Sequence, residues 1–244
     1  MDTFEGLPTE VAEELKRFIE ASKTAFETNL RSIILYGSAA EGRLRPTSDV
    51  NIMLVLRAFD RAQADRIREP LRFARTAIHL AAMFLLEHEL DEAAAAFSVK
   101  FDDIRARHRI MDGDDPFTNM EVSRAAALAR LRQVLLNLRL RFRERYASVG
   151  LREEELARTI AQMAGPLRAC AATLCRLQGR TVDSPKAALE LVVAELGNPK
   201  FQAILPSITE ARSQGLLEPG VAGEVVFALI DLVAAMQSAA NRLA

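Results

Sequence analysis

The apolar residues near the N-terminus recur every three or four positions, which is the spacing of one face of an α-helix. Pro8 and Thr9 stand where such a helix could begin. The sequence therefore predicts a first helix over residues 7–27. The residues that define its apolar face are Val11, Leu15, Phe18, Ile19 and Phe26.

Two short apolar runs follow, SIILYGS at 32–38 and DVNIMLVL at 49–56, and both predict β-strands. The loop between them contains Gly42 and Pro46 and is short enough to join neighbouring antiparallel strands. The pattern then predicts a polar helix at 60–74, a strand at 77–86, a short helix at 87–97 and a fourth strand at 98–104.

From residue 114 onward the composition changes to helix-forming residues. We therefore predict an α+β fold, with a mixed sheet and flanking helices in a domain at 1–113 and an all-α helical bundle in a domain at 114–244. The predicted bundle helices lie at 120–150, at 152–179 with a kink at Gly165-Pro166, at 186–197 after the Ser184-Pro185 cap, and at 221–243.

Composition narrows the class of protein. Half of the 244 residues are apolar, which favours a buried core over disorder, and the formal net charge of −1 provides no general attraction to nucleic acid. Cys170 and Cys175 do not have the spacing of a zinc pair or a secretory disulfide framework, so buried thiols are expected. We see no signal peptide, and the longest apolar run contains Asp231 and is too short to span a membrane, so we expect a cytoplasmic protein without a membrane partner.

The loop between the first two predicted strands carries the candidate chemistry. Gly37 and Ser38 end the first strand, ten residues follow, and Asp49 begins the second. A glycine there lets the backbone approach a bulky ligand, and free N–H groups beside a hydroxyl suit phosphate oxygens. Asp49 and Asn51 are two apart on a strand, so both side chains would leave the same face and could share one Mg²⁺ ion.

This pattern, Gly-Ser, a ten-residue spacer and Ser-Asp-Val-Asn, resembles the signature of the DNA polymerase beta-like nucleotidyltransferase superfamily, in particular its bacterial minimal and antibiotic-modifying members. The resemblance implies a nucleotidyltransferase-like sheet. It also implies transfer of a nucleoside monophosphate from a nucleoside triphosphate, ATP in the first place, to a hydroxyl on a small molecule, protein or RNA. Gly37 and Ser38 would hold phosphates, and Asp49 would ligate Mg²⁺.

Two departures from the family pattern bear on activity. Asn51 stands where a second metal carboxylate is expected, which weakens the site for Mg²⁺ and predicts weak or lost transfer. The third acid is either Asp102 or Asp103, depending on which face of the predicted strand at 98–104 points to the site. Lys100 on that strand either replaces the positive charge of a metal or is a solvated edge residue.

Several other residues have more than one possible role. Arg43 and Arg45 in the loop either meet the triphosphate or are solvated, and Ser48 could orient Asp49. The alternative to an enzyme is a non-catalytic module that binds a nucleotide or a protein partner. One face of the predicted helix at 120–150 carries Arg132, Arg139 and Arg143, and it could either touch RNA or be solvated. The last predicted helix is either part of the bundle core or a homodimer contact.

Overall fold

A computed structural model describes residues 3–45, 48–118, 120, 122–149 and 152–243. The chain forms two compact units, one made of Met1–Ala95 with Phe101–Glu121 and the other of Ala96–Lys100 with Val122–Ala244. We expected the division after residue 113. The contacts place it about eight residues later and assign the short segment 96–100 to the second unit.

The first unit is built on a mixed sheet whose described strands follow the order β3-β2-β1-β4. The two expected antiparallel strands are confirmed, because β1 and β2 pair in that sense. β3 runs parallel to β2 after a helical crossover, and β4 is antiparallel to β1. The strands are β1 (Leu30–Tyr36), β2 (Val50–Leu56), β3 (Leu80–Leu86) and β4 (His108–Gly113).

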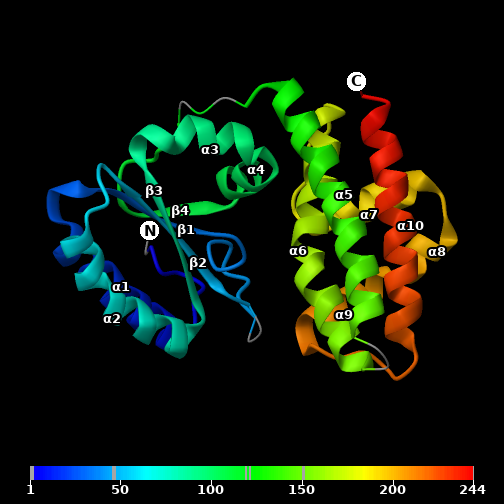
Figure 1. Ribbon diagram of the computed structural model, residues 1–244, viewed down its shortest axis with the longest axis horizontal. Helices are drawn as coiled ribbons and strands as arrows, with labels where there is room; N and C mark the ends of the chain where they lie inside the picture. Colours follow the sequence, from blue (N-terminus) through cyan, green and yellow to red (C-terminus); the bar gives the residue numbers. More distant parts are fainter. Residues whose placement is uncertain (1–2, 46–47, 119, 121, 150–151, 244) are drawn as a thin grey trace. The chain divides into compact units, whose positions relative to one another are not determined.

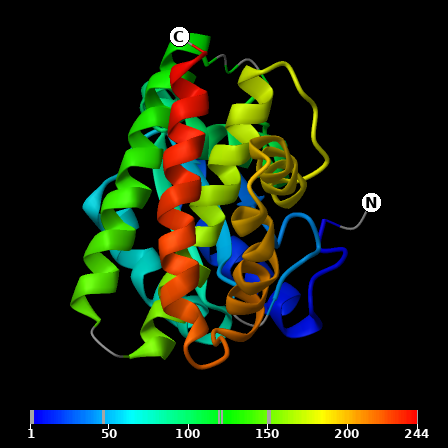
Figure 2. The same ribbon diagram turned by 90° about the vertical axis from the view of Figure 1, so that its right-hand side faces the viewer.

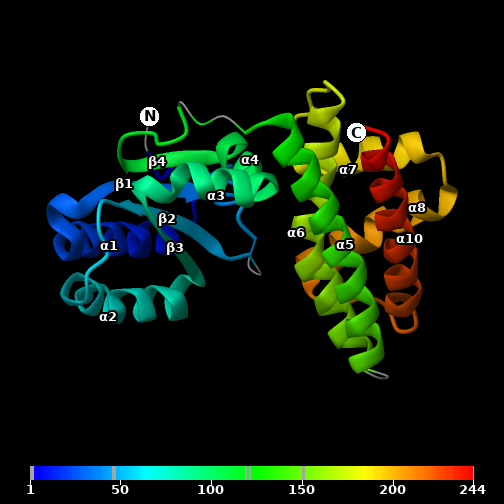
Figure 3. The same ribbon diagram turned by 45° about the horizontal axis from the view of Figure 1, so that its top comes forward.

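Two helices, α1 (Thr9–Phe26) and α2 (Arg61–Ile78), lie side by side on one face of the sheet (Figure 1, Figure 3). Asp60 caps α2, since its side chain accepts the N–H of Gln63 at 3.0 Å. Apolar side chains of α1 and of the two central strands form the core of this unit. It includes Leu15, Phe18, Ile33, Leu35, Ile52 and Leu54, all at most 1% exposed.

The prediction of a strand at 98–104 was wrong, because Ser98–Ala106 forms the helix α4. The alternating letters of Val99-Lys100-Phe101-Asp102 imitate a strand over four residues only. Ion pairs of Asp102 with Arg105 and of Asp103 with Arg107 join residues three and four apart, a spacing that supports a helix. The fourth strand is instead β4, whose polar composition is typical of an edge strand.

The elements around this helix follow the prediction more closely. The helix expected at 87–97 is a 3-10 turn, η2 (Glu87–Glu89), followed by α3 (Leu90–Ala96). A second 3-10 turn, η1 (Glu27–Asn29), leads from α1 into β1.

The second unit is an all-helical bundle, as predicted. α10 packs on α5 and α6, and Figure 2 shows these helices running side by side. Ser184 caps α7 through the N–H of Ala187, and Gly197 ends that helix in the left-handed conformation. Two helices, α8 and α9, occupy a stretch that the sequence left unassigned. The bundle helices are α5 (Arg124–Ser148), α6 (Glu153–Leu177), α7 (Pro185–Leu196), α8 (Pro199–Ala203), α9 (Leu205–Gln214) and α10 (Val221–Asn241).

The helix α10 differs from the sequence expectation in one respect. In the described part of the chain it is the one helix long and apolar enough, by length and composition, to cross a membrane. The same test is passed by core helices of soluble bundles, and 44% of the most apolar window of α10 is buried by other parts of the chain.

Arg132 of α5 donates to the carbonyl groups of Ala240 and Asn241 at the C-terminal end of α10, so this arginine is not simply solvated.

Candidate functional site

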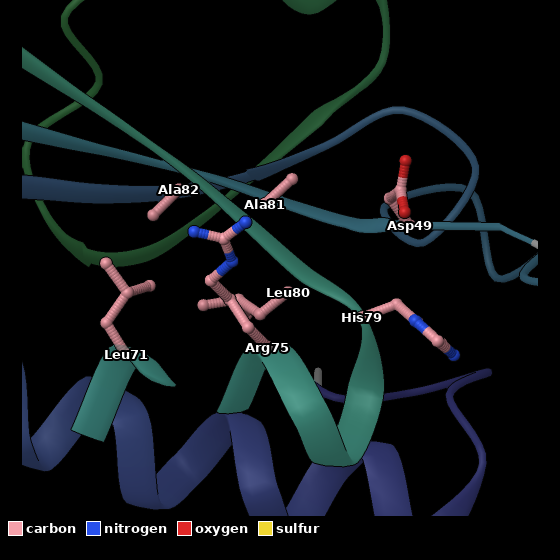
Figure 4. Close-up of a pocket in the computed structure, with 7 residues that line it drawn as sticks. All are labelled: Asp49, Leu71, Arg75, His79, Leu80, Ala81 and Ala82. Atoms are coloured by element: carbon pink, nitrogen blue, oxygen red, sulfur yellow. The ribbon is translucent and has the colours of Figure 1, made fainter. Parts of the chain in front are cut away.

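Asp49 immediately precedes β2 and lines a pocket of about 470 Å³ (Figure 4). The residue is exposed, and no hydrogen bond or ion pair to a described residue engages its carboxylate. A solvent-facing carboxylate in a concave site can ligate a hard cation. The other residues that line the pocket are Leu71, Arg75, His79, Leu80, Ala81 and Ala82.

His79 immediately precedes the neighbouring strand β3, at the position that corresponds to Asp49 before β2. The parallel register pairs Val50 with Leu80, and the Val50 N–H donates to the His79 carbonyl at 3.2 Å. His79 itself ends α2 in a left-handed conformation, with φ of 50°. His79 therefore immediately precedes β3 and lines the same pocket as Asp49, which immediately precedes β2.

Asn51 occupies the position of the expected second metal ligand. Its amide nitrogen donates to the backbone carbonyl of Asp49 at 3.2 Å, so half of its polar side chain is used within the protein. Only its amide oxygen is left for a cation, and that oxygen carries no formal charge. Asn51 pairs with Tyr36 across β1 and β2, which brings it next to Gly37.

The Gly37-Ser38 turn is more tightly bonded than expected. Gly37 has φ of 77°, a conformation that favours glycine, and its N–H donates to the Arg107 carbonyl at 2.9 Å. That N–H is therefore not free for a phosphate. The Ser38 carbonyl accepts the Arg43 N–H at 2.8 Å, whereas the Ser38 hydroxyl has no partner among the described residues.

Arg107 joins the loop after Gly37 to α4 through two carboxylates. Its guanidinium donates to Glu41 at 3.0 Å and, through Nε, to Asp103 at 3.0 Å. Desolvation lowers the pKa of Arg107, but its bonds to these carboxylates outweigh that effect and raise it. Burial and then the nearby charge of Asp103 raise the pKa of Tyr36 to about 12.

Asp102 and Asp103 lie on α4 rather than on a strand, so the expected choice between two strand faces does not arise. Asp103 is committed to Arg107, and Asp102 is buried with Arg105 at 4.0 Å. Their carboxylates are thus engaged inside the protein. Lys100 is exposed on the same helix, and desolvation by surrounding protein atoms lowers the pKa of its ammonium group.

The remaining loop candidates differ in exposure. Arg43 is exposed, whereas Arg45 is half-buried and its Nη1 atom has no hydrogen-bond partner among the described residues. The Ser48 N–H donates to the Arg45 carbonyl at 2.9 Å, and its hydroxyl makes no bond to Asp49. A buried guanidinium nitrogen without a partner is a group that an anionic ligand would satisfy.

Arg75 and His79 line the pocket of Asp49 but were not among the residues that the sequence predicted for the site.

Across the ranges that the structure describes, no group of three or more His, Cys, Asp or Glu side chains is placed to hold a metal ion. One carboxylate with phosphate oxygens and water is nevertheless a common environment for Mg²⁺, so Asp49 fits a nucleotide-bound ion better than a resident one.

The order and pairing of the strands, with the Gly-Ser turn after β1 and Asp49 before β2, belong to a fold that is nucleotidyltransferase-like by structural similarity. One solved structure that the chain resembles is spectinomycin adenyltransferase AAD(9) from Enterococcus faecialis, determined with ATP and spectinomycin. The TM-score is 0.65 at 11% identity, over 92% of this chain and 98% of that one. No protein-family model and no curated protein matches the sequence.

Proposed function

We propose that the first unit binds a nucleoside triphosphate, ATP in the first place, with one Mg²⁺ ion held by Asp49 and the phosphates. Transfer of the nucleoside monophosphate to an acceptor hydroxyl is weak or lost. The observation that carries this proposal is the contrast between the free carboxylate of Asp49 and the amide of Asn51, which is bonded to backbone. A nucleotide is a fitting ligand because the structurally similar adenyltransferase was solved with ATP.

In the reaction of this class, the acceptor oxygen forms a bond to the α-phosphorus while the bond from that phosphorus to the bridging oxygen breaks. Pyrophosphate leaves, and the hydroxyl proton passes to a base or to water. The rate depends mainly on positioning and on cations that neutralise the developing charge. With one carboxylate at 49 and an amide at 51, fewer charges hold those cations, which is why we expect slow transfer.

The second candidate is a binding module without catalysis. It is favoured by the engagement of Asp103 and Glu41 with Arg107, because these carboxylates are already neutralised and cannot serve as metal ligands without breaking that contact. Both candidates require the nucleotide site, and they differ only in turnover.

The test is calorimetric titration of the full chain with a non-hydrolysable ATP analogue, first with Mg²⁺ and then with EDTA. We expect binding that weakens at least about tenfold in EDTA and a similar loss in the Asp49→Asn variant. Asp91→Asn, which changes an exposed acid in the first turn of α3, is the matched control and should bind as the parent does. Absence of binding under both conditions would refute the nucleotide site.

A further inference from the structure

The Asp49 pocket continues along α2 into a second hollow. This second pocket has a volume of about 310 Å³ and shares Leu71 and Arg75 with the first, so the two adjoin. Its other lining residues are Arg68, Arg72 and Thr76. We call the two together the α2 groove. The volume of the first pocket alone is in the range of small-molecule sites.

Acidic neighbours offset the charge of two of the three arginines that line the α2 groove. Arg68 is paired with Asp65 at 3.1 Å, and Arg72 is 3.9 Å from Glu69 with both side chains largely exposed. Arg75 has no ion pair or hydrogen bond to any residue that the structure describes. Arg75 therefore presents an exposed guanidinium where the two pockets meet, with no acidic neighbour to offset its charge among the described residues.

Figure 4 shows how Arg75 is presented. Its guanidinium rises from α2 toward β3 at Ala81 and Ala82, with Leu71 on one side of it and Asp49 on the other. The small alanine side chains leave this part of the strand open. One ligand could thus fill this pocket with its anionic group bound to Arg75 and a neutral part near Asp49.

We infer that the α2 groove binds the phosphate of a small phosphomonoester, and that this molecule is the acceptor for the site at Asp49. The inference rests on the proposed function. A guanidinium donates two parallel hydrogen bonds to phosphate oxygens, and Arg75 is the arginine of the groove that no described acid engages. A cationic group at this position would be repelled by the guanidinium of Arg75, so Arg75 selects against a cationic acceptor.

The experiment is titration of the full chain with ribose 5-phosphate, with ribose and with inorganic phosphate, each with and without a saturating ATP analogue and Mg²⁺. We expect ribose 5-phosphate to bind at least about tenfold more tightly than either other probe, and to bind in the presence of the analogue. Arg75→Gln should remove that preference. Arg61→Gln, on the same helix with a 96% exposed side chain outside the groove, should retain it.

The outcomes separate this inference from the nucleotide proposal. If ribose 5-phosphate competes with the analogue and Arg75→Gln weakens both, Arg75 belongs to the nucleotide site and the acceptor inference is refuted. Equal affinity for inorganic phosphate, or much tighter binding of a 5′-phosphorylated oligoribonucleotide, would also refute a small phosphomonoester. If ribose 5-phosphate binds through Arg75 while the analogue does not bind, the nucleotide proposal fails and the phosphate site stands.

Discussion

Asp49 and His79 precede two parallel strands at matched positions, and both line the same pocket. The side chains of an aspartate and a histidine therefore line one pocket at the start of two neighbouring strands. The pairing arises because α2 crosses over the sheet and returns the chain parallel to β2, so that the residue before β3 meets the residue before β2.

Replacing Asn51 with Asp should restore a second charged ligand. We expect tighter Mg²⁺-dependent binding of the ATP analogue and faster release of pyrophosphate from ATP with water as acceptor, each by at least about tenfold. Adding His79→Asp should increase both further, since Asp tolerates the left-handed backbone at 79. Asn51→Ala is the control and should increase neither. If the Asp variant gains nothing, the site is a binding module rather than a disabled enzyme.

Gly113 should be intolerant of a side chain. A Cβ there would lie 2.0 Å from the carbonyl oxygen of Arg31, and φ at Gly113 is 77°. Gly179 has the same φ but open space around it, so Gly179→Ala isolates the backbone cost of about 1 kcal/mol. We expect Gly113→Ala to lower the free energy of unfolding by about 3 kcal/mol or more, as measured by urea denaturation. Equal losses in the two variants would contradict the predicted clash.

Tyr36 should make stability depend on pH in the alkaline range. Its pKa is raised to about 12 in the folded protein, above the ordinary value of 10, because burial disfavours the phenolate. Its contribution is complete below pH 10 and is lost as the pH rises toward 12, by about 2–3 kcal/mol in all. Tyr36→Phe, compared with the parent in urea at pH 8 and pH 11, should lose less stability between the two values. An identical loss would show that Tyr36 is not the group responsible.

The cysteines should be unreactive in the folded protein. Cys170 is fully buried and burial raises the pKa of its thiol to about 12, while burial also raises the pKa of Cys175. We expect both thiols to react with a disulfide reagent at neutral pH only after denaturation. Fast reaction of the native protein would mean that the bundle opens around α6.

The antiparallel pair β1 and β2 could be predicted from sequence because the pattern of local residues suffices for it. Apolar runs, a short loop and a turn glycine specify two neighbouring strands within 27 residues, from Leu30 to Leu56. The bundle helices were found for a similar reason, since long periodic segments with capping residues such as Ser184 carry their own signal. The strand prediction at 98–104 was wrong because the alternating pattern there covers only four positions, which is too few to distinguish a strand from a helix.

The sequence by itself determined which residues flank the Gly-Ser turn and that Asp49 is followed two positions later by an amide instead of an acid. These residues are close together in the sequence, and the pairing of the two predicted strands brings them close together in space. Tertiary structure alone decided that Arg107 engages Gly37 and Glu41, and that Arg75 and His79 share a pocket with Asp49. Those relationships join residues that are 26 to 70 positions apart through strand pairing and helix crossover. No local pattern encodes which distant side chains such pairing brings together.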